Sequence, residues 1–272
     1  MTDTASILLR SATLRSGVRL PVAESGDASG IPVVLLHGIT DSWCSFDGVM
    51  RHLPHGIRAL VPTLRGHGDA DRPGSGYRPT DFAADLRDLL DTLGIPRAVV
   101  VGHSMGATVA QRFAIEHPAR LRGLVLIGAF AAPRGNREVR ALWDDHVATL
   151  ADPVDPDFVR GFQEGTVARP VPGELLDRAV AESLKVPARV WRAALAGMIE
   201  DDTAAELRRI TAPTLLLWGE RDEFVPRADQ DALLAAIRGA RLVVHAGAGH
   251  APHWEDPARV AREIAAFATL RA

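Results

Sequence analysis

The chain has 272 residues, a net charge of −3 and 47% hydrophobic residues, which suits one large α/β domain or a domain with an insertion. Its arginines and lysines are scattered, so the charge gives no argument for a nucleic-acid partner. The single cysteine, Cys44, excludes an internal disulfide and a cysteine metal cluster. We find no signal-peptide pattern and no apolar run near the roughly 20 residues of a membrane span. We therefore expect a cytoplasmic monomer or homodimer without a membrane partner.

Short runs rich in valine, leucine and isoleucine predict eight β-strands. In chain order they cover residues 7–14, 18–24, 33–36, 59–62, 98–101, 124–127, 214–218 and 241–245. The later runs lack polar alternation, which is typical of a mostly parallel sheet with helices on both faces. No helical pattern separates the first two runs, so we expect them to form an antiparallel hairpin at one edge. The fold class is therefore α/β.

Helical patterns lie between most of the later strands. Residues 81–93 place apolar side chains three and four positions apart, and Thr80 is the expected N-cap. Residues 230–237 and 257–270 carry similar apolar stripes. This alternation of strands and helices predicts a sheet that is wound through the chain with helices between its strands.

The alternation stops between Ile127 and Thr214, where about 85 residues contain no convincing strand. Apolar residues recur there at helical spacing, and several prolines divide the pattern. A structureless loop of this length is implausible in a compact domain. We predict that residues 132–207 form an all-helical cap, inserted between the two parts of the core at 1–131 and 208–272.

The segment 102–106, Gly-His-Ser-Met-Gly, follows a predicted strand and leads into a helical pattern that stops at Pro118. A serine on such a tight turn is the nucleophile elbow. The strand and the helix nearly touch there, so small residues are needed on both sides, and Ser104 must take a strained backbone conformation to expose its Oγ. The first N–H groups of the helix point at the reacting centre, where negative charge develops.

Serine is a poor nucleophile unless a base removes its proton and an acid orients that base. Asp222 follows the predicted strand 214–218, and His250 follows the last predicted strand. Both lie where an acid and a base are required. They follow Ser104 in the order serine, acid, histidine.

These segments resemble the α/β-hydrolase superfamily over nearly the whole chain, above all its branch of small bacterial esterases, enol-lactonases and C–C hydrolases. The segments that carry the likeness are 37–40 (HGIT), 65–68 (RGHG), 102–106 (GHSMG), 219–226 (GERDEFVP) and 249–255 (GHAPHWE). The resemblance implies the α/β-hydrolase fold, with an eight-stranded, mostly parallel sheet and an inserted helical cap.

The resemblance also implies a role for five residues. Ser104 is the expected nucleophile, His250 the base and Asp222 the acid. The backbone N–H groups of Ile39 and Met105 are expected to form the oxyanion hole. The family spacing favours Asp222 over the two glutamates beside it. The sequence His-Gly-Ile lacks the triple-glycine run of another esterase type, which within the family implies a narrow acyl site.

Two other kinds of site are weighed and set aside. A metal cluster of His245, His250 and His253 has no H-E-x-x-H motif to accompany it, and glycines interrupt any helix there. The glycine pairs of the chain lack the third glycine of a dinucleotide fingerprint. We expect no metal and no cofactor. We interpret His37 and His103 as structural, with His37 bonded to local backbone and the His103 side chain directed away from the serine.

The predicted cap is rich in aromatic residues, which together suggest the apolar roof of a pocket. The residues expected at the substrate pocket are Trp43, Phe130, Trp143, Phe158, Phe162 and Trp191. A small apolar ester or lactone, hydrolysed through an acyl-enzyme, is the leading hypothesis. Two alternatives remain open: hydrolysis of a C–C bond in a vinylogous diketone by the same three residues, and a ligand-binding member of the fold without turnover.

Overall fold

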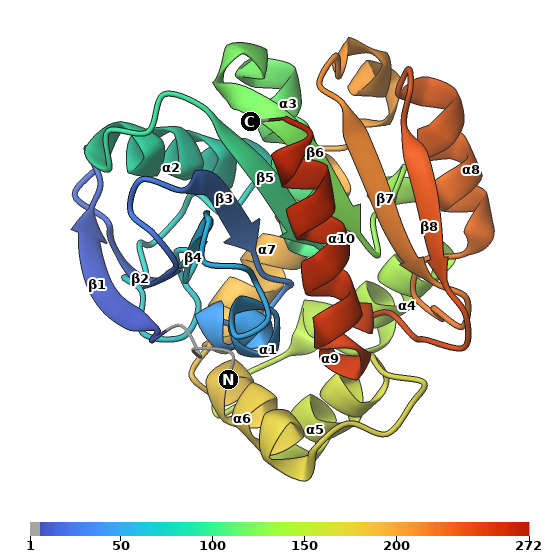
Figure 1. The fold of residues 1–272 in the computed structure, drawn as a ribbon. Coiled ribbons are helices and arrows are strands. Elements are labelled where there is room, and N and C mark those ends of the chain that lie inside the picture. The colour runs from blue at the N-terminus through green and yellow to red at the C-terminus, as the bar shows by residue number, and fades with distance from the viewer. Residues whose placement is uncertain (1–5, 272) are drawn as a thin grey trace.

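The computed structural model describes residues 6–271 and contains one eight-stranded sheet with the strand order β1-β2-β4-β3-β5-β6-β7-β8 (Figure 1). The strands are β1 (Leu8–Thr13), β2 (Arg19–Ser25), β3 (Ile31–Leu36), β4 (Ile57–Pro62), β5 (Ala98–His103), β6 (Leu121–Ile127), β7 (Thr214–Gly219) and β8 (Arg241–His245). β2 pairs antiparallel with β1 and β4, and all other neighbours are parallel. The predicted sheet and its antiparallel edge hairpin are confirmed.

Both faces of the central strands are buried because alternate side chains enter two separate cores. In β3, Val34 and Leu36 join the larger core, whereas Val33 and Leu35 join the smaller one. Apolar residues of α2 (Pro79–Thr92), α3 (Met105–Glu116) and α8 (Arg227–Ala236) belong to the larger core. Those of α1 (Asp47–Met50) and α10 (Pro257–Thr269) belong to the smaller core, and α10 crosses the front of the sheet in Figure 1. This arrangement explains why the strands lack polar alternation.

The start of α2 differs from the prediction. The helix begins at Pro79 with Arg78 as its N-cap, so the assignment of the N-cap to Thr80 is wrong. Proline suits the first helical position because it has no N–H group to leave unpaired. The N–H of Arg78 donates to Oδ2 of Asp81 at 2.9 Å, and the N–H of Thr80 donates to Oδ2 of Asp201 at 3.0 Å. Two carboxylates, rather than a threonine hydroxyl, therefore accept hydrogen bonds from the N–H groups at the start of this helix.

Within the described residues, the segment between β6 and β7 contains helices and no strand. Its α-helices, called the cap helices below, are α4 (Arg137–Asp145), α5 (Pro156–Glu164), α6 (Gly173–Leu184) and α7 (Ala188–Glu200). Figure 1 shows α5 and α6 below the sheet, and α7 behind it. Trp191 of α7 is completely buried, and the rings of Phe158 and Phe162 lie 5.5 and 5.3 Å from it, centroid to centroid. Aromatic packing thus forms the centre of the cap helices.

The remaining elements are short. They are η1 (Trp43–Phe46), η2 (Pro118–Arg120), η3 (Pro133–Gly135), η4 (Val147–Thr149), η5 (Ala204–Arg209) and α9 (Pro252–Glu255). Among residues 6–271, none of the helices combines the length and the apolar character needed to cross a bilayer.

Candidate active site

Ser104 occupies a strained turn between β5 and α3. Its φ of 53° and ψ of −117° lie in a region that side chains other than glycine rarely adopt. A Cβ on Gly102 would lie 2.2 Å from the carbonyl oxygen of Gly106, and one on Gly106 would lie 2.3 Å from that of Leu36. Glycine is required at both positions because the backbones of strand and helix touch there. This close approach holds the serine at the end of the sheet.

The His250 imidazole is oriented by a fully buried carboxylate. His250 follows β8, and its Nδ1 donates a hydrogen bond to Oδ2 of Asp222 at 2.9 Å. The other oxygen of Asp222 accepts the backbone N–H groups of Phe224 and Val225, each at 2.9 Å. Because the ionised carboxylate only accepts hydrogen bonds, the ring proton belongs on Nδ1, which leaves Nε2 able to accept a proton.

Ser104 and His250 line the same cavity, so the structure brings the three predicted catalytic residues together. Among residues 6–271, no hydrogen bond joins the Ser104 hydroxyl to the His250 ring. In enzymes without substrate this bond is often long and shortens only when substrate binds. Of the predicted relay, the bond from His250 to Asp222 is the part that the described residues form.

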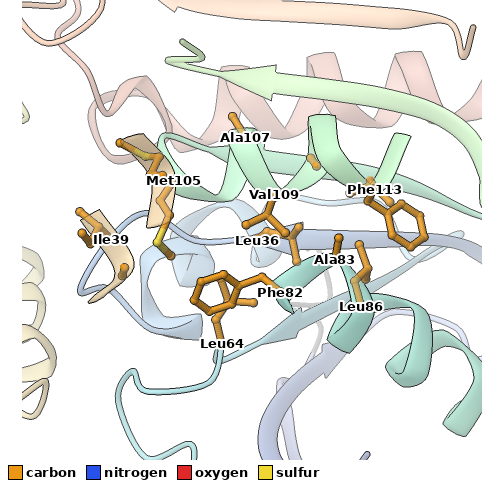
Figure 2. Close-up of a cluster of buried hydrophobic side chains, with 14 of the residues drawn as sticks. Leu36, Ile39, Leu64, Phe82, Ala83, Leu86, Met105, Ala107, Val109 and Phe113 are labelled. Carbon is orange, nitrogen blue, oxygen red and sulfur yellow. The ribbon is translucent and has the colours of Figure 1, made fainter. Parts of the chain in front are cut away.

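The two predicted oxyanion residues lie near the serine, Met105 directly after it in the chain and Ile39 in the wall of the same cavity. The side chains of Ile39 and Met105 are buried in the same apolar cluster, which also contains Leu36 and Phe82 (Figure 2). In the part of the chain that the structure describes, neither backbone N–H donates a hydrogen bond. Ile39 also lines the cavity, and Met105 is the first residue of α3. Both N–H groups are thus free to serve an oxyanion.

The cavity has a volume of about 30 Å³ and lies where the parallel strands end. Loops and elements that follow β3, β5, β6, β7 and β8 supply Gly38, Ile39, Asp41, Ser104, Phe130, Phe224, His250 and Trp254, and β5 itself supplies His103. The cap segment supplies Val139, Leu142, Phe162, Gln163, Thr166, Leu195 and Met198. Ligand sites of open α/β sheets typically form at this edge.

Two of the six predicted pocket aromatics, Phe130 and Phe162, line the cavity, and the other four do not. Trp191 lies behind Phe158 and Phe162 as the centre of the cap packing, and Trp143 packs against the larger core. Trp43 packs against the smaller core on the other face of the sheet. Size and aromatic character do not distinguish a cavity wall from the core behind it, because both bury apolar area.

The prediction missed several residues that form the walls. Leu142 and Met198 lie on the apolar stripes of α4 and α7, a signal that the sequence contains. Phe224 lies in the loop whose N–H groups bind Asp222, and its ring centroid is 5.1 Å from that of His250. Its place next to the acid would have suggested this contact.

Histidine side chains hold the loops of the site. Nε2 of His103 donates to the backbone oxygen of His250 at 3.0 Å. Nδ1 of His37 lies 2.8 Å from the carbonyl oxygen of Gly38, and its Nε2 accepts a hydrogen bond from the N–H of Leu64 at 2.9 Å. These bonds confirm the predicted contacts of His37 with the local backbone. Burial lowers the pKa of His37 to about 3, so it is neutral and able to accept.

Glu255 of α9 is a further structural support that the prediction missed. Its Oε1 accepts the N–H of Gly249 at 2.9 Å and that of Ala168 at 2.7 Å, and its side chain is completely buried. The carboxylate thereby ties the loop of His250 to the segment that follows α5.

Two of the three histidines that were considered for a metal cluster, and set aside, bind other partners. Nε2 of His245 bonds to Glu263 at 2.8 Å, whereas His253 bonds through Nε2 to the hydroxyl of Ser45 at 3.1 Å. Across residues 6–271, no group of three histidine, cysteine, aspartate or glutamate side chains is arranged to hold a metal ion.

Comparisons with known proteins agree with this fold. A model of the alpha/beta hydrolase family matches residues 33–263. An esterase from Exiguobacterium antarcticum superposes with a TM-score of 0.86 at 25% identity, covering 96% of this chain and 100% of that one. An esterase from Rhodococcus sp. ECU1013 gives 0.83 at 26% identity, covering 97% and 99%. A non-heme chloroperoxidase from Streptomyces lividans is 29% identical over 251 residues, which is 86% of this chain and 88% of that protein.

Proposed function

Because this chain belongs to the alpha/beta hydrolase family, we propose that it is a serine hydrolase that cleaves a carboxylic ester or lactone through an acyl-enzyme. The observation that carries this proposal is the shared cavity of Ser104 and His250, with the imidazole bonded to Asp222 at 2.9 Å. The esterases among the similar structures support the ester class.

In the acylation step, Nε2 of His250 takes the hydroxyl proton as Oγ of Ser104 attacks the carbonyl carbon. Asp222 keeps the ring in the tautomer that accepts this proton and stabilises the imidazolium that forms. The imidazolium then protonates the leaving alkoxide, which departs as the alcohol, or stays attached when the substrate is a lactone.

In the deacylation step, His250 takes a proton from water, and the hydroxide formed attacks the acyl carbon. The proton then returns to Oγ of Ser104, which releases the acid. In both steps the N–H groups of Ile39 and Met105 receive the tetrahedral oxyanion. Such donors stabilise the transition state because they already point at the atom where negative charge develops. Losing one typically lowers kcat about 10²–10³-fold.

The walls of the cavity favour a small apolar substrate. Its small volume of about 30 Å³ favours the smallest acyl groups, and Phe130, Phe162 and Leu195 offer apolar contacts. We propose that residues 132–207 act as the cap that selects this substrate, between the core parts 1–131 and 208–272. The cytoplasmic location and the monomeric or homodimeric state stay predictions.

A substrate screen tests this proposal. Purified protein is assayed with p-nitrophenyl acetate, butyrate and octanoate, with short lactones, and with a vinylogous diketone as the C–C substrate. We expect turnover of the short esters or lactones, and a clear preference for acetate or butyrate over octanoate. Turnover of the diketone without any ester hydrolysis would replace the proposal with the C–C alternative. The absence of all turnover and of reaction with a fluorophosphonate would favour the ligand-binding alternative.

A further inference from the structure

Asp41 is a buried carboxylate in the wall of the cavity, two residues after Ile39. Only 5% of the residue is exposed. It also lines a second cavity of about 180 Å³ between η1, α1 and α6. The mechanism above gives this carboxylate no role, although burying a charge is costly unless it is well bonded.

Both oxygens of Asp41 are bonded, and one of the partners belongs to the cap helices. Oδ1 accepts a hydrogen bond from Nε2 of Gln163 in α5 at 3.1 Å, and Oδ2 accepts one from the hydroxyl of Ser45 in η1 at 3.1 Å. The same Nε2 donates to the hydroxyl of Ser183 in α6 at 2.7 Å. That hydroxyl lies 3.0 Å from Oγ1 of Thr40, so the chain of bonds returns to the residue beside Asp41.

The charge of Asp41 determines which groups donate and which accept in this series of hydrogen bonds. An ionised carboxylate only accepts hydrogen bonds, so Gln163 must present its NH2 group, whose second proton goes to Ser183. Thr40 and Ser183 are completely buried, and Gln163 is 1% exposed. A buried polar network of this kind is strong when every member is bonded and costly when one is lost.

The network surrounds a strained residue. Thr40, between Ile39 and Asp41, has a φ of 67°, in the left-handed region that β-branched residues seldom occupy. Such a conformation persists only where surrounding contacts hold it. The bonds from Ser183 to Thr40 and from Gln163 to Asp41 are the contacts with the cap helices that do so. Ile39, whose N–H is the expected oxyanion donor, comes directly before this strained residue in the chain.

We propose that Asp41 is a positioning residue that holds the oxyanion N–H of Ile39 in place by bonding its loop to α5 through Gln163. The cap helices thereby support the chemistry as well as covering it. This inference rests on the proposed function, because it assumes that the Ile39 N–H binds an oxyanion.

Several charged or titratable groups surround Asp41. His250 faces it from the loop after β8, and the second cavity adds Asp47 and Arg51 on or beside α1, Glu174, Arg178 and Glu182 on α6, and Cys44 in η1. A Cβ on Gly38 would lie 3.2 Å from Oδ2 of Asp41 and 3.0 Å from Nδ1 of His103, and Ser45 bonds to His253 as well as to Asp41.

Burial raises the pKa of Asp41 to about 6, while the hydrogen bonds from Gln163 and Ser45 and the charge of His250 lower it. The carboxylate is therefore ionised at neutral pH.

Two single variants and their double variant test the inference. Asp41→Asn keeps the shape but removes the charge, and Gln163→Leu keeps the size but removes the bond to the cap. We expect each to lower kcat for p-nitrophenyl butyrate about 10–100-fold, because a small displacement of a catalytic group is costly, while KM changes less. Since both act through one bond, the double variant should be about as active as the worse single variant.

Asp201→Asn is the matched control, because Asp201 joins the end of α7 to Arg112 of α3 and does not contact the oxyanion loop. It should retain kcat within about 2-fold, as expected of a change outside the site. The inference is overturned if Asp41→Asn and Gln163→Leu match this control in kcat, or if their effects multiply in the double variant. If Asp41→Asn fails to fold, the kcat of Gln163→Leu is compared with that of Asp201→Asn, and equal values overturn the inference. Wild-type protein without ester turnover would instead refute the proposed function.

Discussion

The three residues proposed for catalysis and the cavity walls around them are held in different ways. In the core, Ser104, Asp222 and His250 follow neighbouring parts of one sheet, and backbone contacts fix the turn of the serine. In the cap helices, the position of Phe162 depends on side-chain packing around Trp191. Backbone geometry leaves little freedom, whereas side-chain packing tolerates substitution. We infer that the core specifies the chemistry, and that the cap helices specify which substrate reaches it.

The largest expected effect comes from removing the nucleophile. Ser104→Ala should lower kcat for the preferred ester by about 10⁴–10⁶, since the other groups bind substrate but supply no covalent step. The melting temperature should not fall, because the hydroxyl makes no hydrogen bond to the described protein that folding would lose. Steady-state kinetics and circular dichroism of the two proteins measure these outcomes. Turnover near the wild-type rate would show that another group is the nucleophile.

Asp222→Asn should have the next largest effect, a loss of about 10³–10⁴ in kcat. The N–H groups of Phe224 and Val225 require an oxygen, so the NH2 of the new side chain must face His250. Nδ1 then has to accept, which moves the ring proton to Nε2 and prevents it from taking the serine proton. Glu223→Gln, a neighbouring exposed carboxylate, is the control. Equal activities of the two variants would contradict the assigned acid.

A change in the cap helices should affect stability more than chemistry. Trp191→Ala removes a completely buried ring and should lower the free energy of unfolding by about 3–5 kcal/mol. Trp143→Ala, at a half-buried position on α4, should cost clearly less. Urea unfolding measures both. The comparison between core and cap fails if Trp191→Ala folds stably but no longer reacts with a fluorophosphonate at Ser104.

The smallest expected effect is the share of a single buried histidine in the loss of stability in acid. Burial lowers the pKa of His37 and His253 to about 3 and that of His67 to about 4, and it also lowers that of His103. The unfolded chain then binds protons below a pH of about 6.5 that the folded chain does not, so stability present above this pH is lost as pH falls toward 4. Asp41 opposes this between about pH 4 and 6, because its raised pKa lets the folded state bind a proton first.

These four histidines outnumber the aspartates whose pKa burial raises, which are Asp41, Asp85 and Asp229. The free energy of unfolding should therefore decline from pH 7 to pH 5, each histidine adding up to about 1.4 kcal/mol per pH unit. His253→Phe should make the decline shallower, because the new ring can keep the stacking on Phe46 without titrating. His55→Gln changes an exposed residue and is the control. A decline of the same slope in all three proteins would show that His253 does not contribute.

The sequence predicted the sheet and the meeting of Ser104, Asp222 and His250 better than the walls of the cavity. The strands and the turn of Ser104 depend on local patterns: apolar runs and closely spaced glycines. Asp41 and Gln163 line the cavity and bond to each other across 122 residues of sequence, a contact that no local pattern records. The N-cap of α2 was missed although its signal is local, since Pro79 suits the first helical position and Asp81 accepts the N–H of Arg78.

The most direct test of the central claim is to find which residue a fluorophosphonate modifies. The protein is treated with the probe, digested, and the modified peptide is sequenced by mass spectrometry, with His250→Ala and Ser104→Ala treated in parallel. We predict one phosphonyl group on Ser104 in the wild type, much slower modification without His250, and none without Ser104. Modification of another residue, or equally fast labelling in the absence of His250, would contradict a serine activated by this histidine.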